Sequence, residues 1–183
     1  MKEVFAVRHN FDEFRFLLET PETSKLFVER LIKKKVQWDV SEMRKLEYHL
    51  FVDPKKKKDN RRLDFNVSCF HNGGILCDDE TKQKFENKFG SSVLIFPVKT
   101  DLSRNFYMLT LYEELPASIG RLFENPQTAS ERYKYYFSEK VINGVTLFLD
   151  WKDPATLVTQ DFIDWVTEND IKGMRFEFKG YIK

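Results

Sequence analysis

Residues 156–178 constrain the fold most, because they hold a strand, a helix and a second strand within one short run. Apolar residues up to Val158 predict the first strand, and the polar Thr159 marks its end. Thr159 is suited to be the N-cap of a helix over residues 160–169, since its hydroxyl can accept a hydrogen bond from a free N–H of the first turn. The spacing of the apolar residues places them on one broad helix face: Phe162, Ile163, Trp165 and Val166.

Gly173 follows this helix and leads into a second strand that carries Met174, Phe176 and Phe178. Glycine adopts the left-handed backbone conformation that often ends a helix, whereas a β-branched residue resists it. The whole stretch therefore predicts a strand–helix–strand unit whose helix is pinned to a sheet.

Residues 75–98 repeat the same order of features. A short apolar strand is followed by Asp78 as the helix cap, and Phe85 and Phe89 form the apolar face of the helix. Gly90 ends this helix, and apolar residues then predict an outgoing strand. Two explanations remain open, an internal duplication and the general frequency of such units in mixed proteins.

Period-two alternation predicts two half-buried strands at residues 46–52 and 63–69, which we expect to form an antiparallel pair. Asn143-Gly144 predicts a turn, because both residues tolerate a positive φ. Thr20-Pro21 predicts the start of a helix that ends at the three lysines up to Lys35. The remaining expected strands cover residues 4–7, 106–112, 133–137 and 145–149.

Together these elements predict an α+β fold with mostly antiparallel strands and a few packed helices. We expect two strand-rich halves, residues 1–115 and 116–183, each ending in a strand–helix–strand unit and packed as one compact unit. The irregular segment that contains Pro116, Gly120 and Pro126 is the expected boundary.

The charge balance argues against broad attraction to nucleic acid or to an anionic membrane, because 30 Lys and Arg face 29 Asp and Glu for a net charge of +1. No apolar run is long enough to span a bilayer, and the first residues carry acids and lack an apolar signal core. We therefore expect a cytoplasmic protein.

The most basic stretch, DPKKKKDNRR, could make the protein a nucleic-acid-binding module through Lys55 to Lys58, Arg61 and Arg62. It has no interleaved aromatic residue on which a base could stack. Charge runs are usually solvated, so we favour an exposed hairpin loop without such a role.

Cys69, His71 and Cys77 are the only residues whose types and spacing suggest chemistry. They offer three soft metal ligands without a fourth, which argues against structural zinc. A cysteine beside His71 is the single nominal pairing of a nucleophile with a base. The alternative function is therefore a small-ligand-binding protein or an enzyme with a site near these residues. We otherwise expect a protein without enzymatic activity, and no cofactor.

The C-terminal run YYFSEKVINGVTLFLDWKDPATLVTQDFIDWVTENDIKGMRFEF resembles the signature of a bacterial immunity-protein family of polymorphic toxin systems, the family eleven type, formerly a domain of unknown function. The similarity includes a strand ending at Phe137, a hydrophobic–Gly step at Ile142 and Gly144, and the closing Gly-x-x-Phe from Gly173 to Phe176. It covers about residues 63–178, and its matched positions are structural.

The resemblance implies a non-enzymatic protein that binds and neutralises a cognate toxin. Many such inhibitors of nucleases are strongly acidic, and this chain departs from that pattern with its net charge of +1. We expect the toxin to contact exposed connectors that combine an aromatic anchor with acids. The candidate partner-binding residues are Glu113, Glu114, Asp150, Trp151 and Asp153.

Overall fold

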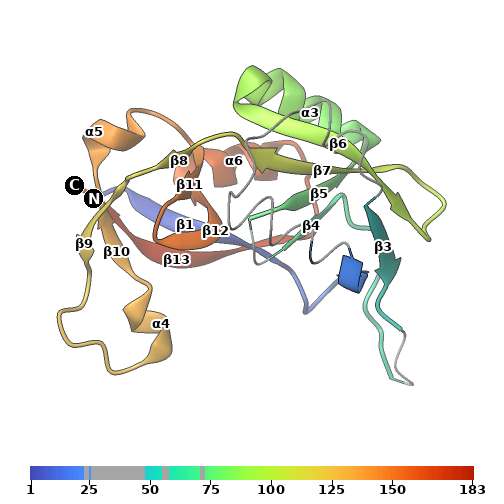
Figure 1. Cartoon of the computed structure of the whole chain (residues 1–183), viewed down its shortest axis with the longest axis horizontal. Helices are drawn as coiled ribbons and strands as arrows, with labels where there is room; N and C mark the ends of the chain where they lie inside the picture. Colours follow the sequence, from blue (N-terminus) through green and yellow to red (C-terminus); the bar gives the residue numbers. More distant parts are fainter. Residues whose placement is uncertain (23–24, 26–47, 55–57, 71–72) are drawn as a thin grey trace.

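The structure is a computed structural model that describes residues 1–22, 25, 48–54, 58–70 and 73–183 (Figure 1). The strands of these residues form two sheets, one of seven strands and one of six, and helices pack beside them. This arrangement confirms the predicted α+β class. Most neighbouring strands run antiparallel, as expected.

The six-stranded sheet is built from the first part of the chain. Its strands lie in the order β2 (Leu17–Glu19), β3 (His49–Val52), β6 (Val93–Thr100), β7 (Phe106–Leu111), β5 (Ile75–Asp78) and β4 (Val67–Cys69). The helix α3 (Asp79–Phe89) and the 3-10 turn η2 (Gly90–Ser92) connect β5 to β6.

The seven-stranded sheet contains the C-terminal strands and the first strand of the chain. Its order is β8 (Glu114–Leu115), β11 (Leu147–Asp150), β12 (Asp153–Thr159), β1 (Glu3–His9), β13 (Met174–Ile182), β10 (Tyr135–Phe137) and β9 (Ser118–Arg121). Its connections include the helices α4 (Ala129–Arg132), α5 (Glu139–Ile142) and α6 (Gln160–Glu168).

The seven-stranded sheet curls towards a barrel. Its two edge strands, β8 and β9, follow each other in the chain, so Pro116 and Ala117 join opposite edges of the sheet (Figure 1). Tyr135 on β10 pairs with Gly180 on β13, and a Cβ at Gly180 would lie 1.7 Å from the Tyr135 carbonyl oxygen. A buried cluster fills this unit, and it includes Val4, Phe137, Phe148 and Leu157.

Both predicted strand–helix–strand units form, and they share one topology. In the first, β5 and β6 are parallel to each other, and β7 lies between them and runs antiparallel to both. In the second, β12 and β13 are parallel, with β1 between them. The middle strand of the first unit, β7, comes after that unit in the chain, whereas the middle strand of the second unit, β1, comes before it.

The two helices pack against each other through aromatic side chains. The ring centroid of Phe85 on α3 lies 5.3 Å from that of Trp165 and 6.2 Å from that of Phe162, both on α6. Phe89 lies 5.9 Å from Phe162. The surrounding buried cluster takes residues from both sheets, so one core joins the two units.

The two helices begin differently. Asp78 caps α3 as predicted, and its Oδ1 accepts from the Thr81 N–H at 3.0 Å. Thr159 occupies the N-cap position of α6, but the predicted side-chain bond is wrong: its buried hydroxyl has no partner among the described residues. Thr159 is also the last residue of β12, where its N–H donates to the Thr146 carbonyl oxygen, so pairing with β11 fixes its backbone.

The expected antiparallel pair around the basic loop does not form. β3 and β4 lie far apart in the sheet, because β6, β7 and β5 separate them. The connecting chain instead runs beside the N-terminal segment, where the Arg15 N–H donates to the Arg62 carbonyl oxygen and the Arg62 N–H to that of Glu13, both at 2.9 Å. These bonds carry the chain across the sheet rather than back along β3.

Asn143 and Gly144 have positive φ, as expected, but they end the helix α5 instead of forming a hairpin turn. Ser138 caps this short helix, which was not predicted. The segment expected to be irregular contains the strand β9 and the helix α4.

The sheets divide the chain differently from residues 1–115 and 116–183. β1 and β8 belong to the seven-stranded sheet, because β1 pairs with β12 and β13, and β8 pairs with β11. The helix expected up to Lys35 lies, beyond its first residues, outside the described residues.

Candidate functional site

The tip of the β11–β12 hairpin presents Trp151 to solvent with 61% of its surface exposed. The hairpin lies over β13 in Figure 1, and its tip is joined to Ser118 on β9 by hydrogen bonds and to Lys179 on β13 by an ion pair. We call the exposed residues around it the tip surface, defined as Ile119, Arg121, Tyr133, Trp151 and Lys152.

Asp150 ties this tip to β9. Its Oδ1 accepts from the N–H groups of Ala117 at 3.0 Å and Ser118 at 2.9 Å, and its Oδ2 accepts from the Ser118 hydroxyl at 2.5 Å. The same Oδ2 accepts from the Lys152 N–H at 3.0 Å. With 2% of its surface exposed, Asp150 closes the barrel and does not face a partner.

Asp153 ties the tip to β13. Its Oδ2 lies 2.9 Å from the Lys179 Nζ, with both side chains almost fully buried, and its Oδ1 accepts from the Ala155 N–H at 2.9 Å. The Lys179 ammonium also lies 5.9 Å from the ring centroid of Tyr133. A buried ion pair satisfied in this way fixes the position of the hairpin.

The expectation that Asp150 and Asp153 are exposed is therefore wrong. Both carboxylates point inward, because backbone N–H groups of β9 and the Lys179 ammonium need acceptors where the hairpin covers the sheet. Trp151 alone of these three residues faces solvent.

Two further exposed apolar side chains lie on segments that contact the tip: Ile119 follows Ser118 on β9, and the Tyr133 ring lies 5.9 Å from the Lys179 ammonium. Ile119 is 57% exposed and Tyr133 is 54% exposed, and among the large hydrophobic residues that the structure describes only Met1 and Trp151 are more exposed. The Lys152 Nζ donates to the Ser118 carbonyl oxygen at 3.3 Å, which brings the tip alongside Ile119. Exposed apolar and aromatic side chains held on a rigid base are typical of a protein-binding surface.

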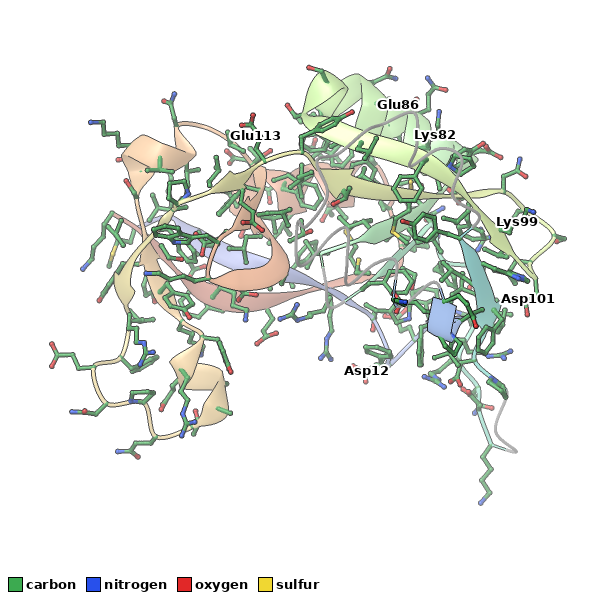
Figure 2. The ribbon with its side chains drawn as sticks, in the orientation of Figure 1. Asp12, Lys82, Glu86, Lys99, Asp101 and Glu113 are labelled. Atoms are coloured by element: carbon green, nitrogen blue, oxygen red, sulfur yellow. The ribbon has the colours of Figure 1, made fainter. Side chains whose placement is uncertain are left out.

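Glu113 and Glu114 lie on the neighbouring edge of the sheet. Glu114 is on β8 opposite Leu149, and Glu113 lines a groove of about 670 Å³ between the two sheets. Figure 2 shows Glu113 between α5 and α3. The apolar lining of the groove comes from Leu111, Tyr112, Leu115, Val145, Leu147 and Phe148. The structure therefore places Glu114 next to β11 and Glu113 in the groove, while Trp151 lies at the end of the β11–β12 hairpin.

The cysteine cluster does not form a reactive site among the described residues. Cys77 is buried and Cys69 half-buried, both in the core that joins the sheets, and burial raises the pKa of both thiols. A raised pKa disfavours the thiolate that would act as nucleophile or metal ligand. His71 lies outside the described residues, and the remainder contain no group of metal-binding side chains.

The described arginines of the basic stretch are paired with acids. Arg61 lies 2.7 Å from Asp59 and 3.6 Å from Asp53, and Arg62 lies 3.2 Å from Glu13. The guanidinium of Arg61 holds the pKa of Asp59 well below its usual range. Lys55 to Lys57 lie outside the described residues.

Sequence reasoning missed Ile119 and Tyr133, because neither shows a motif and their exposure depends on how the barrel closes. A local signal did exist at the tip. Asp150 and Asp153 each accept from the N–H two residues further on, so the D-x-x-D pattern indicates two consecutive Asx turns that project Trp151.

A scan of the sequence against protein-family models finds no match, and a search of the curated proteins finds no relative. Within the described ranges, no helix combines the length and the apolar character needed to cross a membrane.

Proposed function

We propose that this protein is a non-enzymatic immunity protein that binds a cognate bacterial toxin through the tip surface and thereby neutralises it in the cytoplasm. The resemblance of residues 63–178 to an immunity-protein family supports the class of partner. The observation that carries the proposal is the exposure of Trp151 on a tip that Asp150 and Asp153 hold in place.

A fixed base matters because binding is weakened by the entropy lost when a mobile side chain or loop becomes ordered. Asp150 and Asp153 already fix both ends of the tip, so Trp151 can enter a partner pocket with little further ordering. Ile119 and Tyr133 would surround this anchor and exclude water from it.

The alternative, a ligand site or an enzyme centred on the cysteines, has less support. Both thiols pack against the core that joins the two sheets, and a substrate would have to open that core to reach the buried Cys77.

Co-expression with the product of the gene immediately upstream tests the proposal. We expect the two proteins to copurify and the growth of cells that express the toxin to be rescued. Trp151→Ala should weaken binding about 30-fold, the loss expected for a hot-spot aromatic residue. Phe51→Ala is the matched control, since Phe51 is an exposed aromatic residue on β3 of the other sheet.

The control should bind and rescue like the wild type, and both variants should unfold near the wild-type temperature. Absence of copurification together with absence of rescue would overturn the proposal.

A further inference from the structure

Three acids on the segments around the tip surface are bonded within the fold. Asp150 is bonded to Ala117 and Ser118, and Asp153 to Lys179. Glu131 on α4 accepts from the N–H groups of Gln127 and Thr128 in a capping box, and these bonds lower its pKa. Bonds within the fold already occupy these three carboxylates, so few of their oxygen lone pairs are free to bind a partner.

Three cations lie on the segments that meet at this tip, and one of them, Lys134, interacts electrostatically with Glu131. Arg121 and Lys152 are exposed and Lys134 is half-buried, and none of them forms an ion pair with a carboxylate of the described chain. Lys134 lies 5.4 Å from the ring centroid of Phe178 and 6.0 Å from that of Phe123, and Lys152 lies 5.7 Å from that of Trp151. Cations and aromatic rings are therefore interleaved here.

These groups lie at one end of the barrel. Arg121 on β9 pairs with Tyr135 on β10, and Lys134 and Tyr133 directly precede that residue. Burial raises the pKa of the Tyr135 hydroxyl, with Asp153 adding to the rise and Arg121 opposing it, so each of these two charges acts on that hydroxyl.

We propose that the tip surface is complementary to an acidic segment of the toxin, with Arg121, Lys134 and Lys152 placed around Trp151 to meet its carboxylates. This inference rests on the proposed function and specifies the chemistry of the partner. Many nuclease inhibitors are acidic and bind basic nucleases, whereas here the inhibitor surface would be basic and the bound toxin segment acidic. The chain as a whole has a net charge of only +1, so the complementarity is local.

A protein segment fits this surface better than nucleic acid does. Ile119 is aliphatic and cannot stack on a base. An acidic segment with an apolar residue could place that residue against Trp151 and Ile119 while its carboxylates reach the three cations.

Charge reversal tests this inference with the upstream gene product as the ligand. Arg121→Glu, Lys134→Glu and Lys152→Glu should each weaken binding about tenfold, and Lys152→Arg should bind within about twofold of the wild type. Lys88→Glu is the matched control, since it makes the same change of charge at an exposed position of α3, the helix that follows β5 of the other sheet. Raising NaCl from about 50 to about 300 mM should weaken wild-type binding more than that of the reversed variants.

The possible outcomes separate the two proposals. If the wild type binds and rescues but all three reversals bind equally well, the acidic partner is excluded while the proposed function stands. If the wild type binds no upstream product, both fall. Binding of a dT20 oligonucleotide that is lost in Lys152→Glu would assign the surface to nucleic acid instead and overturn the inference. Only reversed variants that keep the wild-type unfolding midpoint are compared. Because three separate positions are tested, the comparison still holds if one variant is destabilised.

Discussion

The two strand–helix–strand units have the same topology but different surroundings. In each, two parallel strands enclose an antiparallel one, and the helices meet through Phe85, Phe89, Phe162 and Trp165. The first unit satisfies the start of its helix with Asp78. The second leaves the Thr159 hydroxyl without a partner and extends its first strand into the hairpin that carries Trp151.

This difference shows how one scaffold serves two purposes. The first unit uses Asp78 to cap its helix and to bind Asn66 and Arg104 beside it. The second unit uses Asp150 and Asp153 to hold a projecting tip, so its polar groups are committed to positioning a surface. The shared topology is consistent with either of the two explanations that the sequence left open.

The glycine after each helix offers the sharpest contrast between the units. Gly173 has φ +115°, and a Cβ there would lie 2.0 Å from the Val67 carbonyl oxygen, whereas a Cβ at Gly90, with φ +54°, meets nothing within 4 Å. Gly173→Ala should destabilise the protein by about 4 kcal/mol or more, through strain and displacement of β4. Gly90→Ala should cost only about 1 kcal/mol. Urea unfolding of both variants measures the difference, and equal losses would show that the two turns are equivalent.

The ion pair between Asp153 and Lys179 has no counterpart in the first unit. Lys179→Met leaves a buried carboxylate without its cation and should cost about 3 kcal/mol. The double variant Asp153→Leu with Lys179→Met should recover part of this loss, because no uncompensated charge stays buried. Thermal unfolding measures both. A single variant as stable as the wild type would show that the pair does not hold the hairpin.

Removing the side chains at the two N-cap positions should have unequal effects. Asp78→Ala should cost about 1 to 2 kcal/mol, because the Thr81 N–H loses its acceptor. Thr159→Val removes a hydroxyl that makes no bond and should change stability by less than about 0.5 kcal/mol, or raise it. Chemical denaturation distinguishes the two, and a loss at Thr159 as large as that at Asp78 would mean that its hydroxyl does cap α6.

His9 lies where the two sheets meet, and it should make their junction sensitive to acid. Its Nε2 lies 3.2 Å from the Phe14 carbonyl oxygen and its Nδ1 lies 3.1 Å from the Ser68 hydroxyl on β4. Neutral His9 fits these partners, with Nε2–H donating and Nδ1 accepting, and burial lowers its pKa below 6.5.

The unfolded chain therefore takes up a proton on His9 at a higher pH than the folded chain does. This contribution to stability is complete above the unfolded pKa and is lost progressively as the pH falls below about 6.5. Unfolding free energies measured between pH 8 and 5 check this. His9→Gln should show a shallower slope than the wild type, and an identical slope would mean that His9 has no part in it.

Local signals explain which parts of the fold were predictable. The cap at Asp78, the glycines after both helices and the apolar faces of α3 and α6 act within a few residues, so the sequence indicates both units. The closure of the barrel is not local, because β1 pairs with strands near the other end of the chain. For the same reason, the sequence alone could not show the roles of two candidate site residues. Asp150 and Asp153 look like ordinary surface acids until Ser118 and Lys179 are brought beside them.

The most direct test of the tip surface is amide hydrogen exchange of the protein alone and in complex with the upstream gene product. Slower exchange in the complex over residues 118–121 and 150–153, with α3 unchanged, is the expected result. Protection confined to α3, or to the groove at residues 111–115, would place the interface elsewhere and contradict the assignment of Trp151 as its anchor.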